Sequence, residues 1–208
     1  MTKLSGLFLL AIGAFITAVG APLVAQSTAD RPTYAADGKL QRPDSYKEWV
    51  FLSSGLGMTY GPNQPAAGQP RFFTNVFVQP ASYREFMKSG RWPEQTMFVL
   101  EIRRSAQSAS IDNGGQSQGA RVTIEVEVKD SARFKDTGGW GFFDFSGTNG
   151  EVAPAASQLA STASCYQCHR TNTAVENTFV QFYPDLMDVA RRMGTVKPTY
   201  DPNHKVTQ

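Results

Sequence analysis

The stretch RVTIEVEVK, residues 121–129, decides the fold class because apolar and polar side chains alternate along its whole length. Successive side chains of a β-strand point to opposite faces. The two expected faces are Val122, Ile124, Val126 and Val128 against Thr123, Glu125, Glu127 and Lys129. This alternation is typical of a strand in an antiparallel sheet that buries one face.

Four further segments on either side of this strand are predicted to join it in a sheet. They are rich in aromatic and β-branched residues and are bounded by turn-forming residues. These segments are residues 46–54, 71–78, 95–103 and 140–145. The third one is expected to place Phe98, Leu100 and Ile102 on one face and Met97, Val99 and Glu101 on the other.

The rest of the chain is predicted to form loops and helices. Residues 55–70 are rich in Gly and Pro, and residues 105–119 in Ser, Gly and Gln, so we expect a loop and a flexible excursion. A short helix is expected over residues 81–88, and a helical stretch from Thr171 to Gly194, interrupted at Pro184. The fold class is therefore α+β, mainly an antiparallel β-sheet with a C-terminal helical segment.

The two ends of the chain differ from its middle. Residues 1–25 have a basic start and an apolar run, the pattern of a signal peptide or, if retained, of an N-terminal anchor. Residues 26–45 are expected to form an extended arm, residues 46–194 the folded domain and residues 195–208 a flexible tail. The leader predicts export, and hence a periplasmic location.

The overall composition excludes several classes of protein. The chain has 208 residues, of which 41% are hydrophobic, so it has enough apolar side chains for a core. Its 20 Lys and Arg residues against 18 Asp and Glu residues give a net charge of +2, which argues against nucleic-acid binding. Two cysteines are too few for a disulfide scaffold.

The two cysteines lie in the run Cys165-Tyr166-Gln167-Cys168-His169, the C-x-x-C-H pattern of covalent c-type haem attachment. Each thiol would add across one vinyl group of the porphyrin, and His169 would bind the iron. Three alternatives remain open at this point: a redox disulfide, a zinc site that uses His204, and a structural disulfide. The expected cofactor is one haem c attached through Cys165 and Cys168.

The sixth iron ligand separates electron carriers from proteins that bind small ligands. Met58 and Met97 are the candidate methionine ligands, and His204 is expected to be a surface residue of the tail. Met87, Met187 and Met193 fall on helical patterns and are expected to fill the core. An open sixth position is favoured.

Several blocks of this sequence, in this order, resemble the cytochrome P-460 family. They are residues 46–50, 74–80, 82–86, 128–131, 165–169 and 179–184. The resemblance implies a periplasmic, mostly β-sheet haem c protein that is usually a homodimer. It covers the chain from about Tyr46 to Pro184.

The family that this sequence resembles has two functional branches. In the hydroxylamine-oxidising branch, a lysine forms an extra covalent bond to the porphyrin, and its position corresponds to Leu100 here. The branch similar to cytochrome c′-beta lacks this bond and binds nitric oxide in an apolar pocket, and Leu100 fits that branch. If a cross-link formed after all, Lys129 would be one candidate.

The resemblance also assigns a role to Glu125, because the oxidising branch carries a distal carboxylate on this strand. Such a group can accept a proton from hydroxylamine or peroxide, although the pattern also allows a plain solvated strand face. Phe98 is expected either to limit access to the iron or to pack as ordinary core, while Phe179 and Phe182 are expected to pack as core. Three functions follow: a binder of a small ligand such as nitric oxide, a hydroxylamine- or peroxide-dependent oxidoreductase, and an electron carrier with a Met sixth ligand.

Overall fold

The computed structural model describes residues 31–60, 69, 71–106, 110–111, 113–148 and 151–204. The predicted signal segment, residues 1–25, lies outside the described residues, as does most of the Gly- and Pro-rich loop. Within the described ranges, no helix has both the length and the apolar character needed to cross a bilayer.

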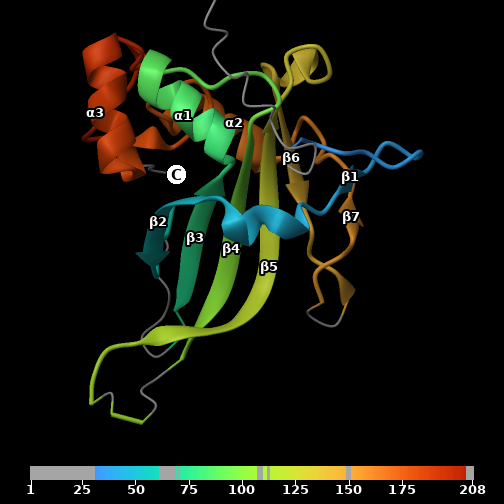
Figure 1. Ribbon diagram of the computed structural model, residues 1–208, viewed down its shortest axis with the longest axis vertical. Coiled ribbons are helices and arrows are strands. Elements are labelled where there is room, and N and C mark those ends of the chain that lie inside the picture. Colours follow the sequence, from blue (N-terminus) through green and yellow to red (C-terminus); the bar gives the residue numbers. More distant parts are fainter. Residues whose placement is uncertain are drawn as a thin grey trace, which may run out of the picture.

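A five-stranded antiparallel sheet forms the centre of the fold, with its strands in chain order (Figure 1). The strands are β2 (Val50–Leu56), β3 (Phe72–Val78), β4 (Met97–Ala106), β5 (Ser117–Lys129) and β6 (Trp140–Asp144). The helix α1 (Pro80–Ser89) connects β3 to β4 and ends at Gly90, which has a φ of 68°. A small second sheet pairs β1 (Leu40–Gln41) with β7 (Ala155–Ala156). The α+β prediction is confirmed.

One face of the large sheet is covered by the N-terminal arm and its neighbours. The alternation along β5 places Ile124, Val126 and Val128 in this layer, together with Met97 and Val99 of β4. Their partners from outside the sheet include Leu40, Tyr46, Trp49 and Phe134. Residues 31–45, which were expected to be extended, therefore contribute a fully buried Leu40 to a core.

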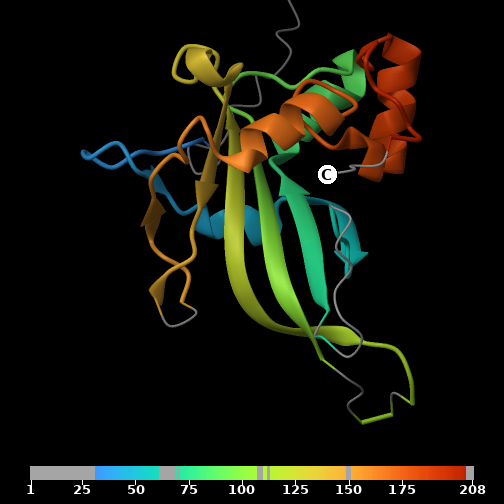
Figure 2. The same cartoon turned by 180° about the vertical axis from the view of Figure 1, so that it is seen from behind.

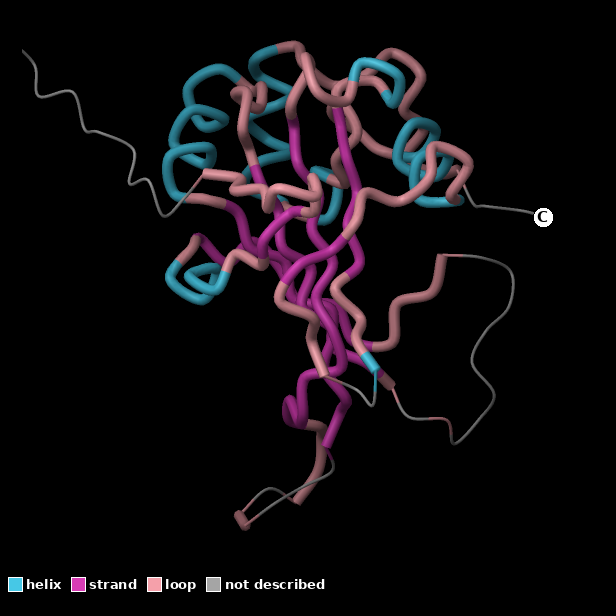
Figure 3. Tube along the Cα trace, turned by 90° about the vertical axis from the view of Figure 1, so that its right-hand side faces the viewer, coloured by secondary structure: helices cyan, strands magenta, loops and turns pink. Residues whose placement is uncertain are grey.

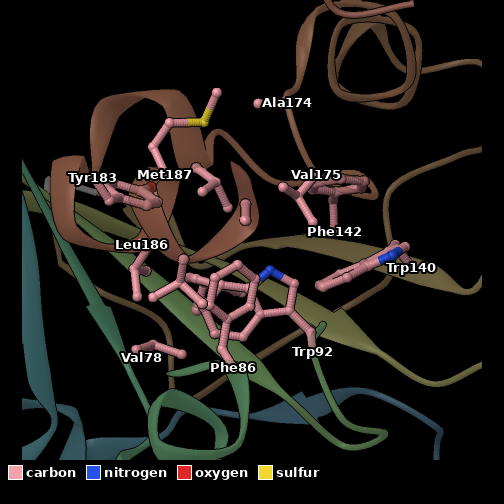
Figure 4. Close-up of a cluster of buried hydrophobic side chains, with 14 of the residues drawn as sticks. Val78, Phe86, Trp92, Trp140, Phe142, Ala174, Val175, Tyr183, Leu186 and Met187 are labelled. Atoms are coloured by element: carbon pink, nitrogen blue, oxygen red, sulfur yellow. The ribbon is translucent and has the colours of Figure 1, made fainter. Parts of the chain in front are cut away.

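The other face of the sheet is covered at one end by helices, as seen from behind in Figure 2 and from the side in Figure 3. They are α1, α2 (Ser164–Asn172) and α3 (Pro184–Met193). Their apolar side chains form a second core with Phe98 and Phe142 of the sheet. Figure 4 shows part of this core, in which Phe86 of α1 packs on Trp92 with ring centroids 4.1 Å apart. The described helices leave the remaining part of this face uncovered.

The prediction of a strand over residues 46–54 is wrong at its start. Residues Asp44–Glu48 form a 3-10 helix, η2, and the strand begins at Val50. Tyr46 donates its backbone N–H to Pro43, and Trp49 donates to Tyr46, which closes the turns. The aromatic side chains of Tyr46 and Trp49 precede the strand and are buried beneath the sheet instead.

The predicted excursion over residues 105–119 is shorter than expected. The ladder between β4 and β5 continues to the pair Ala106–Ser117, so the hairpin projects beyond the rest of the sheet (Figure 1). The backbone hydrogen bonds of a ladder need no apolar side chains when both faces are exposed to water, so the hydrophobic pattern could not reveal this part.

The helical stretch predicted from Thr171 is also wrong in its first half. Helix α2 begins earlier, at Ser164, and ends at Asn172. The hydroxyl of Thr173 donates to the carbonyl of His169, and Glu176 has a φ of 50°, so the chain leaves the helical path. A 3-10 turn, η5 (Val180–Phe182), precedes α3, which Pro184 opens rather than interrupts.

Candidate cofactor site

Helix α2 carries the two cysteines and the histidine of the motif on a single face. Residues three and four positions apart lie on the same side of a helix, so Cys165, Cys168 and His169 all line one cavity of about 690 Å³. The cavity occupies the part of the sheet face that the helices leave open. The sequence placed the motif correctly in the chain but gave no sign that it lies on a helix.

The floor of this cavity is built from alternate residues of the five strands, because these side chains point to the same face. The floor residues are Ser53, Gly55, Thr74, Val76, Phe98, Leu100, Glu125, Glu127, Phe142 and Asp144. The expected faces of β4 and β5 are thus confirmed, since Phe98, Leu100 and Glu125 all lie on the cavity side.

The imidazole of His169 is held by a backbone carbonyl and two aromatic rings. Its Nδ1 lies 2.7 Å from the carbonyl oxygen of Asn177, which can only accept a hydrogen bond. The rings of Phe142 and Phe179 meet the imidazole edge-on at 4.5 and 4.6 Å. The proton therefore resides on Nδ1, which leaves Nε2 with a free lone pair for a metal.

The loop that presents the Asn177 carbonyl is held in place by a hydrogen-bonded contact with the sheet. Lys129 of β5 donates to the carboxylate of Glu176 at 2.8 Å and to the carbonyl of Trp92 at 2.6 Å. Thr173 donates to the carbonyl of Glu176 at 3.0 Å. Lys129 is thus engaged in a partly buried ion pair and does not line the cavity, so the structure gives no support to its prediction as a cross-linking residue.

Glu127 is a residue of this site that the sequence did not single out. Its Oε1 lies 3.5 Å from Nδ1 of His169, and this oxygen is buried and accepts no hydrogen bond from the described residues. Burial raises the pKa of Glu127, and the neighbouring His169 lowers it only in part. Burial alone would lower the pKa of His169, but Glu127 and the Asn177 carbonyl raise it overall. The prediction of a plain solvated face is therefore wrong for Glu127.

Leu100 and Glu125 are direct cross-strand partners on the cavity floor, and Phe98 is the partner of Glu127. Glu125 faces Asp144 across the other edge of β5. Burial raises the pKa of Glu125, and the negative charge of Asp144 raises it further, against the opposing effect of His169. Glu125 is nonetheless accessible from the cavity.

The candidate sixth ligands differ in whether their side chains line the cavity. Met97 is 1% exposed and lies in the core on the opposite face of the sheet, so its prediction as an iron ligand is wrong. Met58 lines the cavity, and so does His204, which was expected at the surface of the tail. The tail is held near the cavity because Lys197 donates to the carbonyl of Arg170 at 3.0 Å and to Thr173 at 2.8 Å.

The other methionines and aromatic residues are only partly as predicted. Met187 fills the core as expected, but Met87 and Met193 are 37% and 49% exposed because they lie on the outer sides of their helices. Phe179 and Phe182 were expected in the core, yet both line the cavity, where their rings stack 5.6 Å apart.

The alternatives for the C-x-x-C-H motif can now be compared with the fold. The two thiols are free, and the motif opens a helix that follows an antiparallel sheet rather than a βαβ unit. Across the part of the chain that the structure describes, no three His, Cys, Asp or Glu side chains are grouped so as to hold a metal ion.

The residues present fit a haem. Two thiols and a correctly protonated imidazole face a large cavity whose walls include Phe98, Leu100, Phe142 and Phe179. No lysine or arginine is found among the described residues that line it. The buried, unpaired oxygen of Glu127 lies behind the imidazole, where a carboxylate partner of a metal-binding histidine is commonly found.

Comparison with known proteins supports this assignment. The sequence profile of the family described as Cytochrome P-460 matches residues 43–180, well over half of the chain. No curated protein matches the chain significantly. The matched region contains the whole five-stranded sheet, α2 and the C-x-x-C-H motif. The chain therefore belongs to the cytochrome P-460 family, a family of haem-binding cytochromes.

Proposed function

We propose that this chain is an exported mono-haem c-type cytochrome that binds a small neutral ligand, such as nitric oxide, at an open position on the iron. The observation that carries this proposal is the presence of Leu100 on the cavity floor, with no lysine among the described lining residues. Leucine has no nucleophilic nitrogen, so it cannot form the porphyrin cross-link of the hydroxylamine-oxidising branch.

In this proposal, Cys165 and Cys168 hold the haem through two thioethers and His169 provides the axial nitrogen. The haem, when bound, would supply an iron that can take one further small ligand. Asn177 keeps the Nδ1 proton in place, so the imidazole presents Nε2 in a fixed orientation.

The apolar part of the cavity wall, which adjoins the carboxylate of Glu125, favours a small ligand without charge. Leu100, Val76 and Phe98 offer no hydrogen bond, so a charged or strongly hydrated ligand loses more solvation than a neutral diatomic molecule does. The ring of Phe98 is 4% exposed and packed between Trp92 and Trp140, so it forms a rigid part of the wall.

An optical titration tests this function. The reduced, haem-loaded protein should show a high-spin, five-coordinate spectrum that changes on addition of nitric oxide. A low-spin reduced spectrum that nitric oxide does not alter would contradict the proposal and would favour an electron carrier. Met58 would then be the ligand to examine, because its side chain lines the cavity, and Met58→Ala would convert that spectrum to high spin.

A second function is favoured by the position of Glu125. This carboxylate stands in the cavity, and its raised pKa makes it a better proton acceptor than an ordinary carboxylate once it is ionised. A hydroxylamine- or peroxide-dependent oxidoreductase would use Glu125 to take a proton from the bound substrate.

The variant Glu125→Gln tests this second function, because it keeps the size of the side chain and removes the base. Turnover of hydroxylamine or peroxide should collapse in this variant, while binding of nitric oxide persists. The matched control is Glu85→Gln, which changes an exposed carboxylate of α1. Equal turnover in Glu125→Gln and the parent protein would remove Glu125 from the mechanism.

The cellular setting is part of the same proposal. Attachment of haem c takes place outside the cytoplasm, which agrees with the signal-like residues 1–25. We expect the mature protein in the periplasm, as a homodimer, with or without its N-terminal segment as an anchor. Cell fractionation with N-terminal sequencing, and the mass of the purified protein in solution, test these expectations.

A further inference from the structure

Tyr60 lies at the mouth of the cavity and is linked to the iron-binding histidine by one intervening ring. Its ring stacks on Phe179, with centroids 6.2 Å apart and planes inclined by 24°. Phe179 in turn contacts the imidazole of His169 at 4.6 Å. Tyr60 is 50% exposed, so this short column of rings connects the haem site to solvent.

We propose that Tyr60 is a surface site for one-electron oxidation, at which phenolic donors too large to enter the cavity are oxidised at the expense of peroxide bound at the haem. This inference rests on the proposed haem site and adds a second, external substrate class to it. The electrons pass from the ring of Tyr60 through Phe179 and His169 to the haem, over closely packed aromatic groups.

The reaction balances with peroxide as the oxidant. Tyr60 gives up one electron to the haem and its phenolic proton to solvent, which leaves a neutral tyrosyl radical. A phenol in solution then returns one electron and one proton to Tyr60 and becomes a phenoxyl radical. Two such events, with the two protons released, reduce one hydrogen peroxide to two waters by cleavage of its O–O bond.

Another tyrosine has a similar relation to His169 but lacks this access to solvent. Tyr166 meets Phe142 at 4.8 Å, and Phe142 meets the imidazole at 4.5 Å. However, Tyr166 is 5% exposed, and its hydroxyl donates to the carbonyl of Leu159, which is a poor proton acceptor. An oxidised Tyr166 would have to keep its proton beside a buried carbonyl, whereas Tyr60 can release its proton to water.

Among the residues that the structure describes, those around Tyr60 leave half of its side chain exposed to a donor molecule. The nearest described polar contact of its hydroxyl is the sulfur of Met58 at 4.0 Å, and the side chain of Met58 is itself 37% exposed. Phe182, which is 39% exposed, stacks on the same Phe179 ring at 5.6 Å. Exposed aromatic faces at one rim are suited to stacking with a planar phenol.

Spin trapping on the haem-loaded protein tests the proposal. We would add hydrogen peroxide in the presence of 2-methyl-2-nitrosopropane and map the adduct by peptide mass spectrometry. The adduct should be found on Tyr60, should be lost in Tyr60→Phe and should persist in Tyr166→Phe. Both variants keep their rings and so keep the packing of their neighbours.

A steady-state assay gives the second readout. Oxidation of a bulky phenol by peroxide should be lost in Tyr60→Phe and retained in Tyr166→Phe, with nitric oxide binding unchanged in both. An adduct on Tyr166, or unchanged phenol oxidation in Tyr60→Phe, would overturn the proposal. A protein that binds nitric oxide but does not react with peroxide would overturn this inference alone, whereas a protein without haem would overturn the proposed function as well.

Discussion

Leu100 of β4 stands directly opposite Glu125 of β5, and both side chains lie on the floor of the cavity. Side chains of a direct cross-strand pair are close neighbours. An apolar residue and a carboxylate therefore share the same small area of the site. Under the proposed function, this pair combines a leucine that the family resemblance assigns to the nitric oxide-binding branch with an acid that it assigns to the hydroxylamine-oxidising branch.

Leu100→Lys is expected to create the missing nucleophile at the position where the oxidising branch has it. The new amine would lie beside Glu125, which can accept its proton and so expose the nitrogen lone pair. We predict a covalent bond to the porphyrin, seen as a displaced absorbance maximum and as a haem peptide that also contains residue 100. Leu100→Met serves as the control, and a variant with an unchanged spectrum and a haem peptide from α2 alone would refute the prediction.

Glu127→Gln is expected to raise the midpoint potential of the haem. In its ionised form, Glu127 places a negative charge 3.5 Å from Nδ1 of His169, which would stabilise the ferric state over the ferrous state, and the amide removes that charge without changing the shape. The rise should be on the order of tens of millivolts, since about 59 mV corresponds to a tenfold change in a one-electron equilibrium. Redox titration measures it, with Glu94→Gln as an exposed control. A potential that does not move would exclude this role.

Glu101 is expected to make folding sensitive to acid. Burial would raise the pKa of Glu101, but hydrogen bonds from Arg103, Tyr46 and Lys47 outweigh it and lower the pKa to about 2 from 4.5. A carboxyl group whose pKa is lower in the folded state than in the unfolded state stabilises the fold at pH values above the unfolded-state pKa. This contribution is lost as the pH falls toward the folded-state pKa of about 2.

Chemical denaturation at several pH values tests the role of Glu101. The free energy of unfolding of the parent protein should fall between about pH 4.5 and 2, whereas Glu101→Gln should be less stable at neutral pH and lose less over the same range. Parallel pH curves for the two proteins would show that Glu101 is not the responsible group.

Gly141→Ala is expected to destabilise the core on the side of the sheet opposite the cavity. An added Cβ at residue 141 would approach the ring of Phe134 to 2.6 Å, and Phe134 is 2% exposed and has little room to move. Overpacking of this kind costs about 1–3 kcal/mol. Thermal unfolding measures the loss, and Gly114→Ala is the control, because its added Cβ meets no atom of the described residues within 4 Å. Equal melting temperatures would contradict the packing argument.

The sequence predicted the elements that have strong local patterns. The alternation in β5 was sufficient to predict an antiparallel sheet, and the spacing of Cys165, Cys168 and His169 was sufficient to predict the haem-attachment motif. Alternation does not reveal what covers a face, however. The pattern of β5 predicts a solvated side chain at Glu127, whereas in the structure α2 and the loop containing Asn177 pack over it.

The remaining errors have the same origin in long-range contacts. Residues 173–179 have helical spacing of apolar residues, but the ion pair between Lys129 and Glu176 and the bonds of Thr173 impose another path. Met97 is a plausible ligand by type, but it lies on the opposite face of β4 from Leu100, and the structure shows that the cavity lies on the Leu100 face. Local patterns carry no information on such contacts between distant segments.

The most direct test of the account is the mass of the exported protein after maturation in a host that can attach haem c, together with its haem peptide. We predict an intact mass that includes one haem, retained after acidified acetone extraction, and a single coloured peptide that contains both Cys165 and Cys168. A colourless protein, or a haem that the solvent removes completely, would contradict the attachment on which the proposed chemistry depends.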